Sequence, residues 1–265
     1  MGKAFIAGVT TRTQPYATLD EVPDEGTPDS TMAAAHARLL SLAVHELRTP
    51  ASVVGGYLRM LQRDTTAPLS ERQRKMVDEA EKSHGRMVAL IDELSEISKL
   101  DAGTAAVNEE TFDLFGLVQE VADSVREVGA GDVKLQVRGE ADRAPLRGDR
   151  TRLRRAFAAF LRAILREQAA ACTIVVDRRR QSSGPGSRAV IVMAREPDVQ
   201  RANDAAPAAF DDQRGGLGLA LPIARRVIER HGGRVWTPAQ ADGADSQAAR
   251  SAIVISLPIG TVAGA

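Results

Sequence analysis

Mostly apolar residues in the first half of the chain recur at alternating spacings of four and three residues. The first stripe comprises Leu40, Val44, Leu47, Ala51, Val54, Leu58 and Leu61. The second comprises Met76, Ala80, Ser83, Met87, Leu90, Leu94 and Ile97. This spacing is typical of helices that pack along a coiled-coil seam. The stripes predict one helix from about residue 30 to residue 64 and a second that ends at about residue 100.

A short break separates the two predicted helices. The Thr-Thr-Ala-Pro run at residues 65–68 interrupts the periodicity, and Ser70 with Gln73 has the sequence of a capping box that starts a helix. Two helices of similar length joined by a short loop form an antiparallel hairpin. One hairpin has too little surface to bury both stripes. We therefore expect a dimer that forms a four-helix bundle, with a hairpin folded against the rest of the chain as the alternative.

The pattern changes after residue 103 and indicates a second domain of mixed helices and strands. Residues 111–114 open a helix that ends near Gly129. Residues 133–137, 172–177, 189–193 and 252–257 are predicted to be strands, and residues 150–168 and 219–231 to be helices. The Ser-Ser-Gly-Pro-Gly run at residues 182–186 predicts a hairpin-type turn.

His45 lies one residue off the first stripe, so its ring is expected at the edge of the seam, within reach of water. Pro50 lies inside the same predicted helix. Because proline has no N–H to give the carbonyl of Glu46, we expect the helix to kink one turn past His45.

The run from His45 to Pro50 reads His-Glu-Leu-Arg-Thr-Pro and resembles the H-box of sensor histidine kinases, and Ser41 also suits that pattern. The resemblance implies that a neutral His45 nitrogen accepts a phosphoryl group and that Glu46 receives the other ring proton. It also implies that Thr49 positions water to dephosphorylate a response regulator. The alternative is a histidine that merely packs on a bundle helix, with Glu46 and Thr49 as ordinary helix surface.

A glycine-rich run in the second domain is similar to the second glycine box of the same family's ATP-binding domain. It contains Gly215, Gly216, Gly218 and Leu219 and is followed by a predicted helix. Glycines let the backbone approach phosphates, and the N-terminus of the following helix favours anions. The resemblance implies ATP and Mg²⁺ as cofactors.

The sequence departs from the family at the predicted magnesium site. Ala159 and Ala163 stand where the family has two asparagines, the second of which binds magnesium. An alanine side chain offers no oxygen, and Mg²⁺ requires oxygen ligands. Glu167, one turn beyond Ala163, is a candidate substitute; the alternative is an ordinary exposed helical glutamate.

The first glycine box departs as well. Ala194, Glu196 and Asp198 occupy the positions of its aspartate and two glycines. The resemblance assigns that aspartate to the adenine amino group, so base recognition is expected to be lost. The lid region, about residues 200–214, is short and holds Phe210 as its candidate aromatic.

The composition gives little support for nucleic-acid binding, disulfide bonds or a metal site. Lysine plus arginine and aspartate plus glutamate each number 35, so a nucleic-acid partner has no global electrostatic support, and the run from Arg178 to Arg180 is predicted to be a solvated strand end. The single cysteine, Cys172, excludes an internal disulfide, suits a reducing compartment and is predicted to be a buried structural thiol. We identify no metal-ligand cluster.

We expect a cytoplasmic protein with no membrane span, because no run approaches the roughly 18 apolar residues that a span requires. Residues 1–9 lack a signal-peptide profile, and residues 1–30 are rich in Thr, Pro, Asp and Gly and are predicted to be disordered. A signal is then expected to arrive through a partner, such as a separate sensor protein or an upstream kinase, or through the catalytic region itself.

Together these patterns predict two domains after the N-terminal segment. Residues 31–103 form a helical-hairpin dimerisation and histidine-phosphotransfer domain, and residues 111–260 form an α/β-sandwich ATPase-type domain with a degenerate nucleotide site. The predicted function is two-component signal transduction by a homodimer in which His45 exchanges a phosphoryl group with a receiver-domain aspartate, and autophosphorylation from ATP is left open. The alternatives are a pseudokinase acting as a histidine phosphotransferase or regulator phosphatase, and a non-catalytic interaction scaffold.

Overall fold

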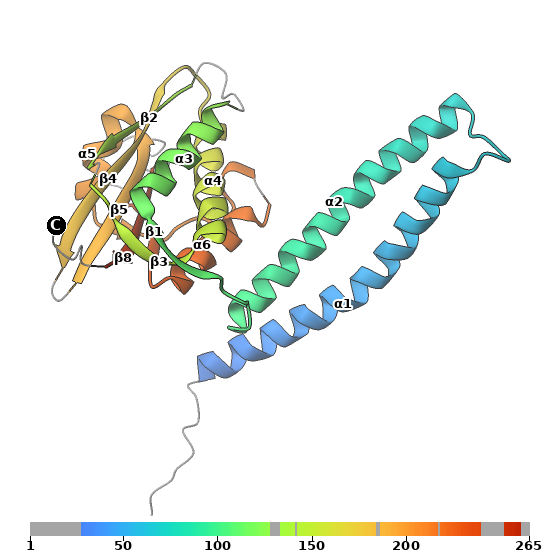
Figure 1. The fold of residues 1–265 in the computed structure, drawn as a ribbon, viewed down its shortest axis with the longest axis horizontal. Coiled ribbons are helices and arrows are strands. Elements are labelled where there is room, and N and C mark those ends of the chain that lie inside the picture. The colour runs from blue at the N-terminus through green and yellow to red at the C-terminus, as the bar shows by residue number, and fades with distance from the viewer. Residues whose placement is uncertain are drawn as a thin grey trace, which may run out of the picture.

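The computed structural model describes residues 28–127, 133–140, 142–183, 186–216, 218–239 and 252–260. Most of the segment predicted to be disordered, residues 1–27, lies outside this range, and the first helix begins at Pro28, slightly before the predicted start. A long helical hairpin extends away from an α/β domain, and only one end of the hairpin contacts that domain (Figure 1). The alternative of a hairpin folded against the rest of the chain is therefore wrong.

The hairpin consists of α1 (Pro28–Arg63) and α2 (Glu71–Asp101), which confirms the two predicted helices. The capping box is also confirmed: the Ser70 hydroxyl accepts from the backbone N–H of Gln73, and the Gln73 side chain accepts from the backbone N–H of Ser70 at 2.9 Å. Helix α1 continues through Pro50 and curves along its length in Figure 1.

The two helices pack through only part of the predicted stripes. Val44 and Ala51 of α1 pack against Ile91 of α2, and all three are nearly fully buried. Ile91 is not in the predicted stripe of α2. Within one chain, six stripe residues remain 41–64% exposed: Leu47, Val54, Leu61, Met76, Met87 and Leu90. Away from the end of α2 that meets the α/β domain, each helix packs on one other helix, so these stripe residues lack a partner surface within one chain.

The α/β domain is built on a six-stranded sheet with the order β2-β4-β5-β8-β7-β6, in which only the β2–β4 pair is parallel. Its strands are β2 (Lys134–Gly139), β4 (Thr173–Ser183), β5 (Gly186–Arg195), β6 (Pro207–Ala208), β7 (Arg234–Pro238) and β8 (Ile253–Ile259). Strands β4 and β5 pair antiparallel up to Ser183 and Gly186, as the predicted hairpin turn requires. All four predicted strands are thus present.

Helices cover both faces of the sheet, which makes the domain a sandwich. The main core lies between one face and α3 (Leu114–Glu127), α4 (Arg150–Arg166) and α6 (Ala220–Arg230). On the other face, α5 (Val199–Asp204) packs with Trp236 over a smaller cluster. Two short 3₁₀ turns, η1 (Glu196–Asp198) and η2 (Arg214–Gly216), lie in the connection between β5 and α6.

A separate two-stranded sheet, β1 (Glu109–Asp113) with β3 (Pro145–Asp149), was missed by the sequence analysis. The helix expected to open over residues 111–114 begins at Leu114, because residues 111–113 belong to β1. The Asp113 carboxylate accepts from the backbone N–H groups of Phe115 (3.2 Å) and Ala144 (2.8 Å) and so joins the start of α3 to the segment before β3. The predicted end of this helix near Gly129 lies outside the described residues.

The prediction that Arg178 to Arg180 form a solvated strand end is wrong, because β4 continues to Ser183 and all three side chains are half-buried. Arg178 donates to the carbonyl of Phe115 at 2.9 Å and lies over that ring. Cys172 is only half-buried, with its Sγ 3.6 Å from the Gln168 side-chain oxygen. Across the described ranges, no helix combines the length and apolar character needed to cross a membrane.

The end of α2 is fixed to the α/β domain by both packing and charge. Leu100 and Ala105 belong to the main core of the domain. Asp101 accepts from Arg226 of α6 at 2.6 Å, and Glu96 pairs with Arg152 of α4 at 3.4 Å. The junction between hairpin and domain is therefore an ordered contact.

Candidate functional site

His45 lies on the exposed surface of α1, where its neighbour Val44 is buried against α2. The side chains of His45 and Glu46 are 81% and 72% exposed, and His45 Nδ1 lies 3.4 Å from Glu46 Oε1. A carboxylate only accepts hydrogen bonds, so this arrangement favours the ring tautomer that carries its proton on Nδ1. The lone pair then resides on Nε2, the nitrogen that points away from Glu46. The pair has the chemistry of a nucleophile oriented by an acceptor.

Thr49 and Arg48 lie one turn beyond His45, on the exposed surface of the same helix. Arg48 donates from Nη2 to Asp92 of α2 at 2.8 Å, so it contributes an interhelical ion pair that sequence reasoning did not predict. Both partners are more than half exposed, and such pairs contribute little stability. The sequence-predicted residues His45, Glu46 and Thr49 thus share one accessible stretch of α1.

The glycine-rich run has the backbone geometry that requires glycine. Gly215, Gly216 and Gly218 have φ of 68°, 59° and 61°, in the left-handed region, and α6 begins directly after Leu219. The intervening Leu217 lies outside the described residues. At Gly215 a Cβ would come within 2.8 Å of the Cα of Ala163, so the backbone of the run lies directly on α4.

Arg214 and Glu167 form a bidentate ion pair beside this contact. Arg214 donates from Nε to Glu167 Oε1 at 2.9 Å and from Nη2 to Oε2, and its Nη1 donates to the carbonyl of Ala252 at 3.1 Å. The Arg214 side chain is 5% exposed and that of Glu167 is 25% exposed. Both Glu167 oxygens are therefore engaged by arginine, which contradicts the suggestion that Glu167 replaces the missing magnesium ligand.

The other expected nucleotide ligands are buried alanines or paired carboxylates. Ala163 and Ala194 are fully buried. Glu196 pairs with Arg138, while Asp198 accepts from Arg195 Nε at 2.9 Å and from Arg201 at 2.7 Å. Ala163 and Ala194 offer no side-chain oxygen, and the carboxylates of Glu196 and Asp198 are paired with arginines, so ATP and Mg²⁺ do not fit the residues present. The described residues hold no cluster of three or more His, Cys, Asp or Glu suited to a metal.

Phe210, the predicted aromatic of the lid, packs edge-on against Phe160 of α4 with ring centroids 5.7 Å apart. It belongs to the edge of the main core. Around the glycine run the structure thus places three protein contacts: a glycine on an alanine, an ion pair and an aromatic contact.

Two histidines have structural partners. Nδ1 of His231 contacts the carbonyl of Val227 at 2.6 Å, and its Nε2 accepts from the backbone N–H of Asp149 at 2.9 Å. On α2, Nε2 of His84 contacts the carbonyl of Ala51 at 2.7 Å. Sequence reasoning missed His84; the only available signal was a glycine, Gly55, on the facing helix.

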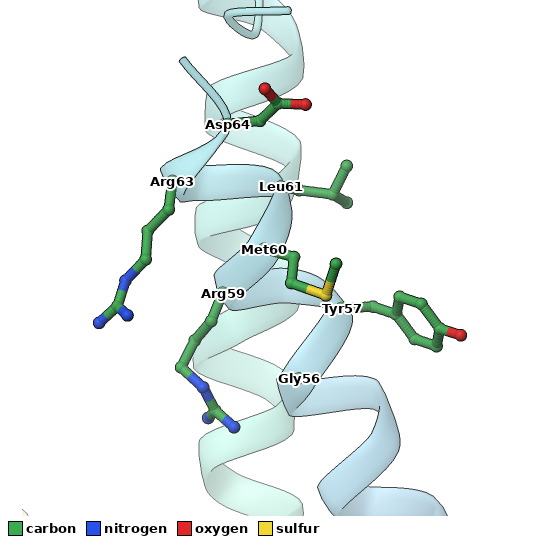
Figure 2. Close-up of a pocket in the computed structure, with 7 residues that line it drawn as sticks. All are labelled: Gly56, Tyr57, Arg59, Met60, Leu61, Arg63 and Asp64. Atoms are coloured by element: carbon green, nitrogen blue, oxygen red, sulfur yellow. The ribbon is translucent and has the colours of Figure 1, made fainter. Parts of the chain in front are cut away.

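Pockets border the hairpin at several places. One of about 550 Å³ lies on the C-terminal half of α1 and is shown in Figure 2. Its lining includes Tyr57 and Met60, which are 64% and 67% exposed, and the charged residues Arg59, Arg63 and Asp64. A second, of about 290 Å³, lies between α2, α4 and α6. At its rim, burial raises the pKa of Glu93, and the negative charge of Glu96 raises it further.

A family model and two known proteins that match this chain are all described as histidine kinases. The HisKA model, described as the His Kinase A (phospho-acceptor) domain, matches residues 35–103. The chain is 27% identical over 216 residues to the circadian input-output histidine kinase CikA of Synechococcus elongatus. The aligned region covers 76% of this chain and 28% of CikA. The chain is 28% identical over 211 residues to the signal transduction histidine-protein kinase BaeS of Escherichia coli, covering 72% of this chain and 41% of BaeS.

A similar fold is found among solved structures. The crystal structure of full-length ShkA in complex with AMPPNP aligns with a TM-score of 0.58 at 19% identity, over 86% of this chain and 47% of ShkA. At this identity the similarity concerns the fold. The chain spans less than half the length of each of these three proteins.

Proposed function

The chain belongs to the sensor histidine kinase family, and from this premise we propose that it acts in two-component signal transduction by exchanging a phosphoryl group between His45 and a receiver-domain aspartate. The observation that carries the proposal is the exposed His45 ring with Glu46 beside its Nδ1. An acceptor on Nδ1 leaves Nε2 available for attack on phosphorus. The exposure of the ring leaves room for a receiver domain to approach.

In the proposed reaction, the Nε2 lone pair attacks the phosphorus of a receiver's aspartyl phosphate. A P–N bond forms while the P–O bond to the aspartate breaks, and the receiver recovers its carboxylate. The ring becomes positively charged during the attack, and the Glu46 carboxylate stabilises that charge by accepting the Nδ1 proton's hydrogen bond. The reverse reaction transfers the group to a receiver. Such transfers depend mainly on alignment and charge stabilisation.

We further propose that the α/β domain is a scaffold that does not support autophosphorylation from ATP. This is supported by the packing of Gly215 on Ala163 and by the ion pair that Arg214 makes with Glu167. Ala194, buried where the family has an aspartate, supports the same proposal. The phosphoryl group then comes from a phosphorylated regulator or an upstream kinase.

Regulator dephosphorylation is a second candidate activity, favoured by Thr49. Its hydroxyl lies one turn from His45 on an exposed stretch of α1. There it has access to a receiver's aspartyl phosphate and is able to hold a water molecule for hydrolysis. Transfer to His45 and hydrolysis beside it use the same docked receiver.

We propose that the protein works as a homodimer. The stripe residues that lack a partner in one chain include Leu47 and Val54 on α1 and Met87 and Leu90 on α2. Burial of such side chains contributes about 25 cal/mol per Å² of apolar surface, and a second hairpin supplies the matching surface. The pocket around Tyr57 and Met60 in Figure 2 is then the proposed docking surface for a receiver domain.

The test supplies radiolabelled phosphate in two separate ways: as purified receiver domains phosphorylated with acetyl phosphate, and as ATP with magnesium. We expect acid-labile label on the protein from receivers only. His45→Gln should abolish it, whereas His36→Gln, at another exposed histidine of α1, should not. Label from ATP would contradict the scaffold proposal. An absence of label from both sources, with unchanged dephosphorylation of every receiver, would leave a non-catalytic interaction scaffold.

A further inference from the structure

Two side chains of α2 hydrogen-bond to backbone carbonyls of α1, one on each side of His45. Ser98 donates from its hydroxyl to the carbonyl of Ala37 at 3.0 Å in a buried position. His84 contacts the carbonyl of Ala51 from Nε2 at 2.7 Å. A carbonyl only accepts, so Nε2 of His84 carries the proton. Both contacts join α2 to the backbone of α1 rather than to its side chains.

The His84 contact lies where the backbone of α1 is weakened. Pro50 has no N–H, so the carbonyl of Glu46 loses its hydrogen bond within the helix. This loss loosens the coupling between the segment of α1 that carries His45 and the segment that follows. Ala51, whose carbonyl contacts His84, is the first residue after the proline.

The ring of His84 occupies space that only glycine leaves open. A Cβ on Gly55 would lie 2.5 Å from its Cε1 and 2.9 Å from its Nε2. Gly55 is buried in the middle of α1, where glycine is unfavourable compared with alanine by about 1 kcal/mol. A packing role against His84 explains why this position is small.

From these contacts we infer that His84 is a positioning residue for phosphotransfer at His45. It holds the segment of α1 after Pro50 on α2, while the Ser98 contact and the packing of Val44 on Ile91 hold the segment before it. The angle of α1 at the proline is then set by α2. The inference rests on the proposed function.

The position of this contact determines which kinetic constant it affects. The proposed docking surface around Tyr57 and Met60 lies after Pro50, whereas His45 lies before it. A receiver seated on the segment after Pro50 reaches His45 only if the segments before and after Pro50 keep their relative orientation. Misplacement of a reacting group by about 1 Å costs up to about a hundredfold in rate. Loss of the His84 contact therefore lowers kcat and leaves the receiver's KM unchanged.

The experiment compares four variants of the full chain. His84→Gln keeps a donor near the Ala51 carbonyl, whereas His84→Phe keeps a ring without a donor. Gly55→Ala displaces the ring, and Gly85→Ala is its matched control, because no described atom lies within 4 Å of a Cβ at Gly85. Two quantities are measured: phosphotransfer from a labelled receiver, resolved into kcat and KM, and amide hydrogen exchange over residues 51–57.

We expect His84→Phe and Gly55→Ala to lower kcat by about tenfold at unchanged KM and to speed exchange by about fivefold, as the loss of one hydrogen bond would. His84→Gln should restore most of both, and Gly85→Ala should match the wild type. Wild-type kcat and exchange in His84→Phe would overturn the inference, as would phosphoryl label on His84 itself. If the wild type accepts no phosphate, the proposed function fails, and the exchange data still decide whether His84 holds α1.

Discussion

Replacing Glu167 with alanine should destabilise the α/β domain, because the change strands a buried guanidinium. Arg214 is 5% exposed and donates to both oxygens of Glu167 and to the carbonyl of Ala252. Glu167→Ala removes two of these three acceptors and the only opposite charge in the pair. Removing one partner of a buried pair costs about 3–5 kcal/mol. Because a quarter of the Glu167 side chain is exposed, water reaches the site in part, and we expect a loss of about 2–3 kcal/mol in the free energy of unfolding.

The assay is urea unfolding followed by the fluorescence of Trp236, the single tryptophan of the chain, which lies in β7 of this domain. The matched control is Glu120→Ala, which breaks the pair with Arg150 at 2.7 Å in the same domain. Both members of that pair are at least one-third exposed, so we expect a loss below about 1 kcal/mol.

A double variant separates the charge effect from general damage at this position. Glu167→Leu with Arg214→Met removes both charges and keeps apolar volume, so it should recover most of the stability lost in Glu167→Ala. The reasoning is refuted if Glu167→Ala costs no more than Glu120→Ala. It is also refuted if the double variant is less stable than Glu167→Ala alone.

Five further changes test other parts of the structure. Gly215→Ala should cost more than 2 kcal/mol by the same unfolding assay, because its Cβ meets α4 and its φ is positive, whereas Gly216→Ala meets open space and should cost only about 1–2 kcal/mol. Thr49→Ala should slow receiver dephosphorylation several-fold and leave labelling of His45 intact. Glu93→Gln should raise the melting temperature at pH 7, and it should not do so well below the usual carboxyl pKa of 4.5. Burial disfavours the ionised carboxylate in the folded state, which raises the pKa of Glu93, and the resulting loss of stability grows as the pH rises. Val54→Asp should weaken the proposed dimer in sedimentation, because Val54 lies in the part of the stripe that has no partner within one chain.

The elements that sequence reasoning predicted are those specified by local pattern. Apolar spacing located α1 and α2, and the Ser70 capping box located the start of α2, because both signals lie within a few turns of the chain. The face of α2 that packs on α1 was not predictable in this way. Ile91 and Leu90 are equally apolar neighbours, and only the three-dimensional position of α1 selects Ile91 for burial.

The same limit applies to the candidate sites. His45 and Glu46 are adjacent in sequence, so a local motif was enough to predict their contact. The pair of Arg214 with Glu167 joins residues 47 positions apart, and β1 pairs with β3 across the whole of α3 and β2. No periodicity or spacing in the chain encodes such pairings. The charge on Glu167 was therefore visible in the sequence, while its partner was not.

The two halves of the protein differ in what their chemistry requires. A phosphoaccepting histidine needs only an exposed ring and a neighbouring acceptor, and α1 supplies both from consecutive residues. A nucleotide site needs oxygen ligands and empty space at the same place. Here Ala163 is buried and offers no side-chain oxygen, and Gly215 packs directly on it. An Ala163→Asn change would add a carboxamide oxygen but push a larger side chain against the glycine run. In the proposed scaffold role, the missing oxygen and the close packing thus involve the same residue, and adding an oxygen at position 163 does not open space beside the glycine run.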